Sequence, residues 1–585
     1  MSYNPTENDP EHQKRLILAV VISTIVMGLW YYFYQMPLQH AKQEAQKQVH
    51  AAQLKQKQEE AANTNPESIL ATVPTTAQGA PAPSREEVLK LSPRVNISNG
   101  RLHGSIRLIG ARLDDITLVN YREKLAKNSP EVALMNPKGA KHANFIDIGW
   151  IAEGNLKTPD GNSLWTLESG ATLTPETPVT ISWDNGQGQK FYIDYSVDKN
   201  YMFNINQRLE NNSGAEVKFL PYGLISKAEK MDEENFILHT GPMGVMDGTI
   251  TEVAYSKLRK EPRQEFNNST GWIGITDKYW FKSLIPQRDE TYKATFQQSV
   301  IGDIERFQVD YLGTSHSVKP GTTSSYKMQI FTGAKELKLL EKYAVEQNIP
   351  HFERAIDFGW FHFITKPMYY TLIKFYSWLG NFGLAILLLT LCVKLLLFPL
   401  ARKGYISMGR LKQLQPKISE LQKRYKDDKL ELQKNMMALY KKEKVNPAAG
   451  CLPIILQIPI FFSLYKVFFV SIEMRHAPFF GWIKDLSERD PTSLFNAFGL
   501  LPYDVPSFLM IGVFPCIMGV TMYIQQLLQP APADPMTAKM LRMMPLIFLF
   551  MFASFPAGLV IYWCFSNTLT ILQQLYFLRN HPRKS

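Results

Sequence analysis

The spacing of apolar residues divides the chain into regions of different periodicity. From residue 88 to about 345, apolar and polar residues alternate with a period of two, which is typical of half-buried strands. Three alternating segments follow one another at 179–183, 191–197 and 201–205, with turn-like sequences at 184–188 and 198–200. A further strand is expected over 326–330 and a helix over 334–346. The pattern predicts a large β-sandwich domain over residues 88–350.

Long apolar runs replace this alternation near the N-terminus and in the last third of the chain. Six of them are candidate membrane-spanning helices, at 16–34, 382–401, 451–472, 506–529, 542–555 and 557–578. The first run has nineteen residues, so as a helix it is about 28 Å long, enough to cross a bilayer core. It ends in the aromatic stretch Trp30–Tyr34, which is typical of a membrane interface, so an uncleaved signal-anchor is favoured over a cleaved signal peptide.

Two further segments connect these regions. Residues 35–87 are rich in Gln, Lys, Glu and Ala and then in Pro, Thr and Ala, a composition that predicts a flexible tether. Residues 355–379 are crowded with aromatic side chains and contain Lys366 and Lys374. This enrichment predicts an amphipathic helix that lies in the membrane interface, and a core helix of the β domain is the alternative.

The positive charge of the chain lies mainly in one loop. The 585 residues include 64 Lys and Arg against 53 Asp and Glu, a net charge of +11. Loop 402–444 holds 13 basic and 5 acidic residues, whereas loop 473–504 holds 3 and 5. Basic loops remain in the cytoplasm. We therefore expect loop 473–504 and the β domain outside the cytoplasm, and the following segments inside it: 1–15, 402–444, 530–541 and 579–585.

The four cysteines lie in or beside the apolar runs, at Cys392, Cys451, Cys516 and Cys564. No CxxC motif or Cys/His ligand spacing is present, so the sequence predicts neither disulfides nor a metal site, and no cofactor. The β domain contains no cysteine and is expected to fold on its core alone.

The basic loop 402–444 contains a heptad-like apolar seam. Leucine, isoleucine and tyrosine side chains step by three and four residues at Leu411, Leu414, Ile418, Leu421 and Tyr425. The charged stretch 426–429 interrupts the seam, which continues at Leu432, Met436 and Leu439. We expect two antiparallel helices that form an exposed basic hairpin. The hairpin either docks an anionic partner or carries charges that only fix the topology, and the absence of interleaved aromatics argues against sequence-specific nucleic-acid binding.

Polar side chains inside the apolar runs are the most informative feature, because such groups are costly in lipid. Lys394 lies in the run 382–401, one helical turn after Thr390. The other polar residues are Gln457, Thr521, Gln525, Gln529, Trp563, Asn567, Thr570 and Gln574. With the orientation above, all lie near the midplane or in the cytoplasmic half, which favours a hydrophilic cavity open to the cytoplasm. Interhelical hydrogen bonding is the alternative for the set, and snorkelling of the side chain to the interface is the alternative for Lys394.

Several motifs of the last third resemble those of one known family. They are MMALYKKEKVNPAAGCLPIILQIPIFFSLYKV at 436–467, IEMRHAPF at 472–479, WIKDLS at 482–487, DPM at 534–536 and FPAGLVIYWCFSNTLTILQQ at 555–574. Together they are similar to the YidC membrane protein insertases of Gram-negative bacteria. The family usually has an arginine in its groove where this chain has Lys394, and a lysine keeps the charge without the planar fork of donors. The bulky aromatic of the family's last groove helix corresponds to Trp563, and Tyr562 lies beside it in the sequence.

The resemblance implies a fold, an activity and partners. The fold is a polytopic α-helical membrane protein of six transmembrane helices, five of which form the core, with a periplasmic galactose-mutarotase-like β-supersandwich and a cytoplasmic helical hairpin. The activity is insertion and folding of inner-membrane proteins, alone or with the Sec translocon, with ribosomes, nascent membrane proteins and the phospholipid bilayer as partners. Both termini are expected in the cytoplasm. The implied groove residues are Thr390, Lys394, Gln457, Gln525, Tyr562, Trp563, Asn567 and Thr570.

Two other functions fit parts of the sequence. A transporter or channel predicts polar groups in both leaflets and inverted repeats, and neither is seen. A membrane-anchored periplasmic carbohydrate-binding protein or enzyme predicts paired carboxylates on the β domain, and this domain has no such residues at a diagnostic spacing. The sequence therefore favours an insertase that is not an enzyme.

Overall fold

The computed structural model describes most of the chain beyond residue 82. The described residues are 83–140, 142–228, 238–301, 304–359, 361–425, 428–443, 445, 452–503, 505–506, 509–529 and 535–580. The predicted cytoplasmic N-terminus, the signal-anchor, nearly all of the tether and the end of the cytoplasmic tail lie outside these residues.

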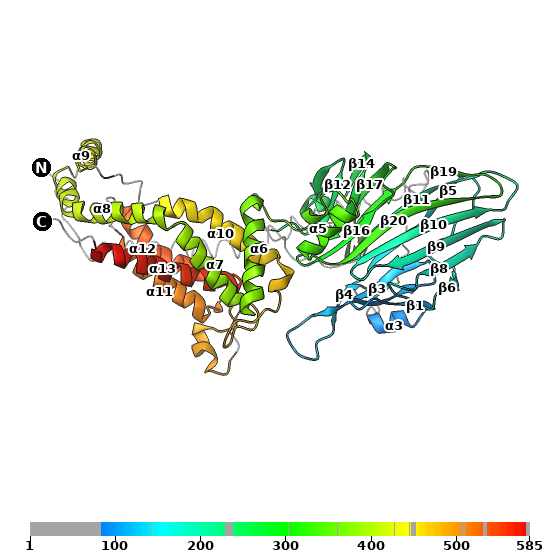
Figure 1. Ribbon diagram of the computed structural model, residues 1–585, viewed down its shortest axis with the longest axis horizontal. Coiled ribbons are helices and arrows are strands. Elements are labelled where there is room, and N and C mark those ends of the chain that lie inside the picture. Colours follow the sequence, from blue (N-terminus) through cyan, green and yellow to red (C-terminus); the bar gives the residue numbers. More distant parts are fainter. Residues whose placement is uncertain are drawn as a thin grey trace, which may run out of the picture. The chain divides into compact units, whose positions relative to one another are not determined.

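Two antiparallel sheets form the β domain (Figure 1). The larger sheet contains β1 (Arg94–Ser98), β2 (Leu102–Arg107), β3 (Arg112–Arg122), β4 (Glu131–Met135), β5 (Asn144–Glu153), β7 (Thr172–Leu173), β11 (Val217–Ala228), β14 (Arg263–Ser269), β17 (Tyr292–Ile301), β18 (Ile304–Leu312) and β19 (His316–Val318). The smaller sheet contains β6 (Thr166–Ser169), β8 (Val179–Asp184), β9 (Gln189–Val197), β10 (Met202–Asn211), β12 (Gly241–Met246), β13 (Thr249–Glu252), β15 (Gly271–Thr276), β16 (Trp280–Ile285) and β20 (Thr322–Ala334). The exception to the antiparallel pattern is the pairing of β1 with β7, which is parallel.

The alternation of the sequence follows from the packing of these sheets. Along β9, buried and half-buried residues alternate without interruption, and the strand pairs with β8 and β10 in the predicted meander. Its buried side chains join a core that contains completely buried aromatics such as Trp150, Trp272 and Phe281. The predicted β-sandwich is therefore confirmed.

Short helices complete the β domain. They are α3 (Arg85–Leu89), α4 (Tyr255–Lys260), α5 (Leu337–Glu346) and the 3-10 helix η3 (Phe352–Ala355). Helix α5 confirms the helix expected over 334–346, and it buries Leu337, Leu340 and Tyr343 against the domain.

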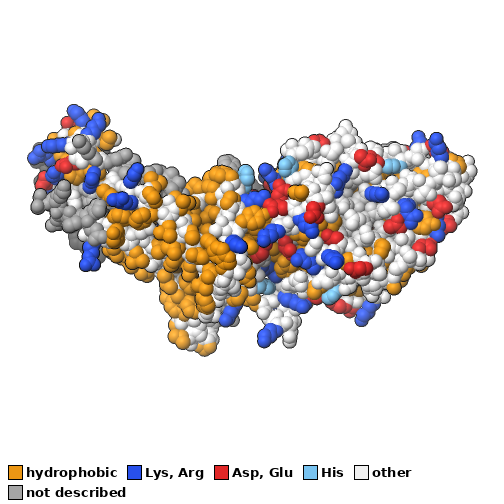
Figure 2. All heavy atoms as spheres, in the orientation of Figure 1, with side chains coloured by type: hydrophobic (Ala, Val, Ile, Leu, Met, Phe, Trp, Pro, Cys, Tyr) orange, Lys and Arg blue, Asp and Glu red, His pale blue; other side chains and the backbone are white. Residues whose placement is uncertain are grey.

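The last third of the chain is helical. Its helices are α6 (His362–Leu379), α7 (Phe382–Leu396), α8 (Phe398–Arg424), α9 (Lys429–Lys442), α10 (Leu452–Val470), α11 (Val513–Leu528), α12 (Pro535–Phe552) and α13 (Ala557–Asn580), with the 3-10 helices η5 (Ile472–Met474) and η6 (Leu494–Gly499). Figure 2 shows that the face of this region in view is mostly apolar apart from the basic α8 and α9, whereas the β domain exposes charged and other polar groups.

The helix expected over 355–379 begins later than predicted, at His362. It buries Thr365, Met368, Tyr369 and Leu372, which recur on one face, and exposes aromatic side chains on another. Because α6 packs against α7 and α10, it belongs to the helical region and is not a core helix of the β domain.

The run 382–401 is not one straight helix. Helix α7 ends at Leu396, and α8 begins at Phe398 after a bend of 66°. Pro399 lies in the first turn of α8, where its missing N–H leaves no helical hydrogen bond unmade. Among the described residues, no single helix is long and apolar enough to cross a membrane alone. The bent pair α7 and α8, taken together, has sufficient length and apolar character.

The helices at the predicted runs 506–529 and 542–555 start at other residues than expected. Helix α11 starts at Val513, seven residues after the predicted start at 506, because the backbone before it is bonded elsewhere: Leu494 N donates to the carbonyl of Ile511 at 2.8 Å. Helix α12 begins at Pro535, inside the segment predicted as the loop 530–541. Lys539 and Arg542 end the apolar run there but do not interrupt the helix.

The basic hairpin contains the two expected helices, α8 and α9. The seam residues Leu411, Leu414 and Ile418 are buried and pack with Met436, Leu439 and Tyr440. Asp428, within the charged interruption, caps α9 by accepting hydrogen bonds from the N–H groups of Leu430 and Glu431 at 3.1 and 2.9 Å.

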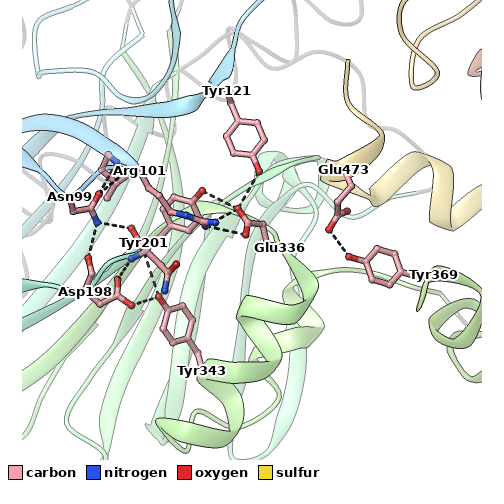
Figure 3. A network of polar contacts seen from close by, with 11 residues as sticks. Asn99, Arg101, Tyr121, Asp198, Tyr201, Glu336, Tyr343, Tyr369 and Glu473 are labelled. Carbon is pink, nitrogen blue, oxygen red and sulfur yellow. Dashed lines mark hydrogen bonds and ion pairs between the residues drawn. The ribbon is translucent and has the colours of Figure 1, made fainter. Parts of the chain in front are cut away.

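Within the β domain, a polar network joins the start of α5 to the sheets (Figure 3). The Glu336 carboxylate, just before α5, accepts from Arg101 at 3.0 Å, from the Tyr201 hydroxyl at 3.0 Å and from the Tyr121 hydroxyl at 3.2 Å. Three separate strand regions are thereby fastened to the start of one helix.

The same figure shows a second carboxylate, Glu473 of η5, which accepts from the Tyr369 hydroxyl of α6 at 2.5 Å. Burial raises the pKa of Glu473 above its ordinary value, although the Tyr369 bond acts in the opposite direction. A neutral acid at this position costs less to bury than a carboxylate.

Candidate functional site

Helix α13 is the centre of the polar contacts in the helical region. Asn567, Thr570 and Gln574, which step by three and four residues, are all buried, as is the neighbouring Ser566. From this helix, hydrogen bonds extend to three other apolar helices, α7, α10 and α11. The predicted polar stripe therefore faces other helices, as the cost of exposing amides to lipid requires.

The contact between α7 and α13 involves the one charged candidate. Lys394, in the last turn of α7, donates from Nζ to the Thr570 hydroxyl at 2.9 Å. The Thr570 hydroxyl in turn donates to the Ser566 carbonyl at 2.8 Å, so its oxygen is oriented to accept from the lysine. Within the described part of the chain, no Asp or Glu lies within ion-pair distance of Lys394. The Lys394 side chain is half-buried and is directed towards α13.

The other contacts join neutral groups. The Gln457 amide of α10 donates to the Tyr562 hydroxyl, and Tyr562 is completely buried. The Asn567 amide donates to the Thr521 hydroxyl of α11 at 3.3 Å, and that hydroxyl donates back to the Met518 carbonyl at 2.8 Å. Neutral bonds of this kind are worth only about 0.6 kcal/mol on average between membrane helices.

Three of the predicted residues take no part in these pairs. The buried Thr390 hydroxyl donates to Ile386 of its own helix at 2.7 Å. Gln525 is half-buried on α11 and makes no hydrogen bond within the described ranges. Trp563 lies among aromatic rings, with its centroid 4.8 Å from Phe461 and 5.1 Å from Phe552.

Sequence reasoning missed two contacts of this region. The Tyr405 hydroxyl of α8 donates to the Gln573 side chain of α13 at 3.3 Å, which ties the basic hairpin to the central helix. Lys466 of α10 pairs with Asp357, which precedes α6, at 2.5 Å. The partner residues are far away along the chain, so no local pattern could identify them.

The β domain contains a separate open cavity of about 280 Å³, lined mainly by residues of β4, β5, β11 and β16. Its one lining acid, Asp277, pairs with Lys227 at 2.6 Å, and positive neighbours hold its pKa below the ordinary value. An acid–base pair of carboxylates is therefore not present in this lining. In the residues that the structure describes, no group of three or more metal-ligating side chains occurs either.

Comparisons with known proteins cover nearly the whole chain. Residues 374–584 match the family described as 60Kd inner membrane protein, and residues 94–371 match the family described as YidC periplasmic domain. A protein of Rickettsia bellii named membrane protein insertase YidC is 46% identical over 564 residues, which is 96% of this chain and 98% of the relative. A protein of Rickettsia rickettsii with the same name has the same identity and coverage.

Similar solved structures include an active YidC insertase with its first transmembrane domain resolved. It is 19% identical, covers 82% of this chain and 94% of its own, and has a TM-score of 0.35. A galactose mutarotase related enzyme from Lactobacillus acidophilus is 13% identical over 41% of this chain and 97% of its own, with a TM-score of 0.29.

Proposed function

The chain belongs to the YidC family of membrane protein insertases, and we propose that it inserts inner-membrane proteins by way of the polar side chains around α13. Membership in this family confirms the resemblance found in the sequence, with its periplasmic β-sandwich and helical membrane region. It sets aside the transporter and the carbohydrate-protein alternatives. It also agrees with the expectation that the protein is not an enzyme.

The observation that supports this site best is Lys394, a cation bonded to a neutral hydroxyl with no carboxylate beside it in the described chain. An acidic residue of an entering chain gains an attraction there that it lacks elsewhere in the bundle. The Thr570 hydroxyl holds the ammonium in place until such a group arrives. Lys394 is thus proposed as the residue that receives acidic translocated segments.

The neutral pairs suggest how the site opens. Gln457 with Tyr562, and Asn567 with Thr521, each form one hydrogen bond between helices. A polar segment that enters can replace such a bond with one of its own, so the net change in free energy is small. Burial of the apolar part of the substrate in lipid then provides the driving force, at about 25 cal/mol per Å². Thr390, Gln525 and Trp563 complete the proposed groove as lining residues.

The proposed topology keeps the segments expected from charge. An inner-membrane protein with a periplasmic domain is what the family provides. We place both termini, the hairpin over 402–444 and the connection before α12 in the cytoplasm, and α6 in the membrane interface. The basic hairpin and tail are the proposed contacts for ribosomes, and the Sec translocon is a proposed partner in the membrane.

Protease protection in liposomes that contain only this purified chain tests the proposal. The substrate is a short membrane protein with a small acidic translocated region. We expect this region to become protected, since the groove and the bilayer are both present. If the region remains exposed while the insertase is folded by circular dichroism, insertion by this chain alone is contradicted.

Three variants connect the result to the site. Lys394→Ala is expected to lower protection of the acidic substrate by about tenfold, the equivalent of losing about 1.4 kcal/mol. Lys394→Arg retains the charge and is expected to retain most of the activity. Lys484→Ala, an exposed lysine of the 473–504 loop, is the matched control and should have no effect. Equal activity of Lys394→Ala and the wild type contradicts the role of the cation.

A further inference from the structure

The loop between η5 and α11 has an apolar tip. No charged residue occurs between Asp490 and Asp504. The large apolar side chains that this tip exposes are Leu494, Phe495, Phe498, Leu500, Leu501 and Tyr503, and Leu500 is 85% exposed. An apolar cluster of this extent is unfavourable in water, so its surroundings require an explanation.

Most backbone N–H groups of the tip are hydrogen-bonded within the protein. Seven N–H groups between 494 and 503 have protein acceptors: those of Leu494, Phe495, Phe498, Gly499, Leu500, Leu501 and Tyr503. The Asn496 side chain accepts from Gly499 at 3.0 Å, and the Ser493 side chain accepts from Phe495 at 3.2 Å. A segment that enters hydrocarbon must satisfy its backbone internally in this way, whereas a loop in water has no such requirement.

The turn at the tip holds two non-glycine residues in the left-handed region of backbone conformation. Ala497 and Phe498 have positive φ angles of 51° and 59°, a region that costs a non-glycine residue about 1–3 kcal/mol. The turn is closed by the Phe498 N–H, which donates to the Ser493 carbonyl at 2.6 Å. Apolar side chains on both sides of this turn remain on its outside.

The loop is also fastened to α11. The Thr492 hydroxyl accepts from the Val513 N–H at 3.0 Å, and the Asp490 carboxylate accepts from the Phe514 N–H at 3.1 Å, so the loop caps the first turn of the helix. Gly512 permits this contact, since a Cβ there would lie 2.4 Å from Cγ of Asp490. Any force on the tip is therefore transmitted to α11.

The apolar surface continues from the tip region onto the helices. Helix α11 exposes Ile517, Val520 and Leu527, and α12 exposes Leu546, Ile547 and Phe550. Figure 2 shows that hydrophobic side chains cover most of the face in view between the hairpin and the β domain. In an inner-membrane protein this surface is the one that faces lipid.

We propose that residues 494–503 are embedded in the acyl chains of the outer leaflet and fix the depth of α11 in the membrane. Loop 473–504 then divides into a water-exposed part with the exposed charges Lys484 and Arg489 and a lipid-embedded tip. The occupant of the apolar surface is lipid, because the internal backbone bonds and the continuous apolar surface both match a hydrocarbon environment. This role does not depend on the mechanism proposed for Lys394.

Depth-dependent quenching of a fluorescent probe tests the proposal. The full chain with Leu500→Cys is labelled with a bimane maleimide and placed in phosphatidylcholine vesicles with or without brominated acyl chains. Lys484→Cys is the matched control on the same loop, and the wild-type chain, labelled in the same way, measures the background from its own cysteines. Leu500 is mostly exposed, so its replacement leaves the fold intact.

We expect brominated chains to reduce the Leu500→Cys emission by about twofold or more, as for a group 5–10 Å below the headgroups, and to leave Lys484→Cys unchanged. If brominated chains change the emission of Leu500→Cys no more than that of Lys484→Cys, the proposal is overturned. The proposal is also overturned if the emission of the Leu500→Cys probe depends on the protein-to-lipid ratio and not on bromine. In that case a second copy of the chain covers the tip.

Discussion

The β domain and the helical region of this chain place their side chains in opposite ways. In the β domain, Trp272 and Phe281 are completely buried, and charged groups face outward or form close pairs such as Arg112 with Asp147, whose two bonds are 2.6 and 2.7 Å long. In the helical region, Leu396 is 79% exposed, whereas Thr390 and Thr570 are buried. The contrast identifies two solvents, water for one region and hydrocarbon for the other.

The polar bonds differ between the two regions as well. Ionised pairs in the β domain range from the nearly buried Arg112 and Asp147 to the partly exposed Lys190 and Glu168. The contacts around α13 are neutral bonds, together with one ammonium on a hydroxyl. A strong ion pair inside a bundle would be difficult for a substrate to displace, whereas these bonds are easily exchanged.

The largest expected effect comes from emptying the aromatic core of the β domain. Phe281 packs on Trp272, Phe331 and Phe352 with centroids 5.4–5.8 Å away. Phe281→Ala should lower the free energy of unfolding by about 3–5 kcal/mol. The change is measured from the denaturant unfolding curve followed by tryptophan fluorescence. Phe363→Ala on α6, where the ring is 65% exposed, is the control, and we expect a change within about 0.5 kcal/mol. Similar losses in both variants contradict the contrast between the regions.

A buried acid of the β domain is expected to produce the next largest effect. Burial raises the pKa of Asp310 from 3.8 to about 6, against the hydrogen bond from Gln308. Between these two values, the folded state holds a proton that the unfolded state releases. The contribution of protonated Asp310 to stability is therefore complete below about pH 4 and is lost as the pH rises through 6. Asp310→Asn should stabilise the domain at pH 7.5 by at most about 3 kcal/mol and have no such effect at pH 4.

Asp194 provides a control of opposite sign for that experiment. Hydrogen bonds and charge from Arg208 hold its pKa below the ordinary value, so its contribution is present above that value and is lost as the pH falls. Asp194→Asn should therefore destabilise the domain at pH 7.5. Unfolding midpoints at both pH values for the two variants decide the matter, and the same pH dependence in both would be inconsistent with these assignments.

In the helical region, loss of one interhelical bond is expected to be less costly. Thr570→Val keeps the shape of the side chain but leaves Lys394 without its acceptor, at a cost of about 1–2 kcal/mol. Thr568→Val is the matched control, because the exposed Thr568 hydroxyl donates only to Cys564 of its own helix. Unfolding in mixed micelles compares the two, and equal stability would mean that the α7–α13 contact contributes nothing.

The smallest effect is expected in the basic hairpin of α8 and α9. Asp428→Ala removes the cap of α9 and should cost about 1 kcal/mol, whereas Asp428→Asn keeps an acceptor oxygen. Hydrogen exchange of the amides of Leu430 and Glu431 should accelerate about fivefold in the alanine variant alone. Unchanged exchange would show that packing of the seam, and not the cap, holds this end of the helix.

The sequence predicted the parts of the fold that depend on periodicity. The alternation at 191–197 matches β9, and the seam at Leu411, Leu414 and Ile418 is buried as expected. Polar residues in apolar runs also identified the side chains of α13 that face other helices. Each of these signals is local, because the neighbours that create it are a few residues away.

What the sequence could not supply were contacts between distant segments. The late start of α11 depends on a hydrogen bond between the backbones of Leu494 and Ile511. The ion pair of Lys466 depends on Asp357, which is far away along the chain. The bend at Leu397 has a local cause in Pro399, but a proline in a first helical turn is compatible with both a straight and a bent connection. The choice between them is made by packing.

The position of α13 in the chain has a consequence for biogenesis. The ribosome makes α7, α10 and α11 first, with Lys394, Gln457 and Thr521 separated from their α13 partners by 176, 105 and 46 residues. During that interval these groups have no helix to bond, and water or another protein must solvate them. Since chains are made at about 5–20 residues per second, the earliest of these groups waits for many seconds. A newly made chain thus holds these polar groups without their partners until α13 follows, and we expect its assembly to be slowest when existing copies are scarce.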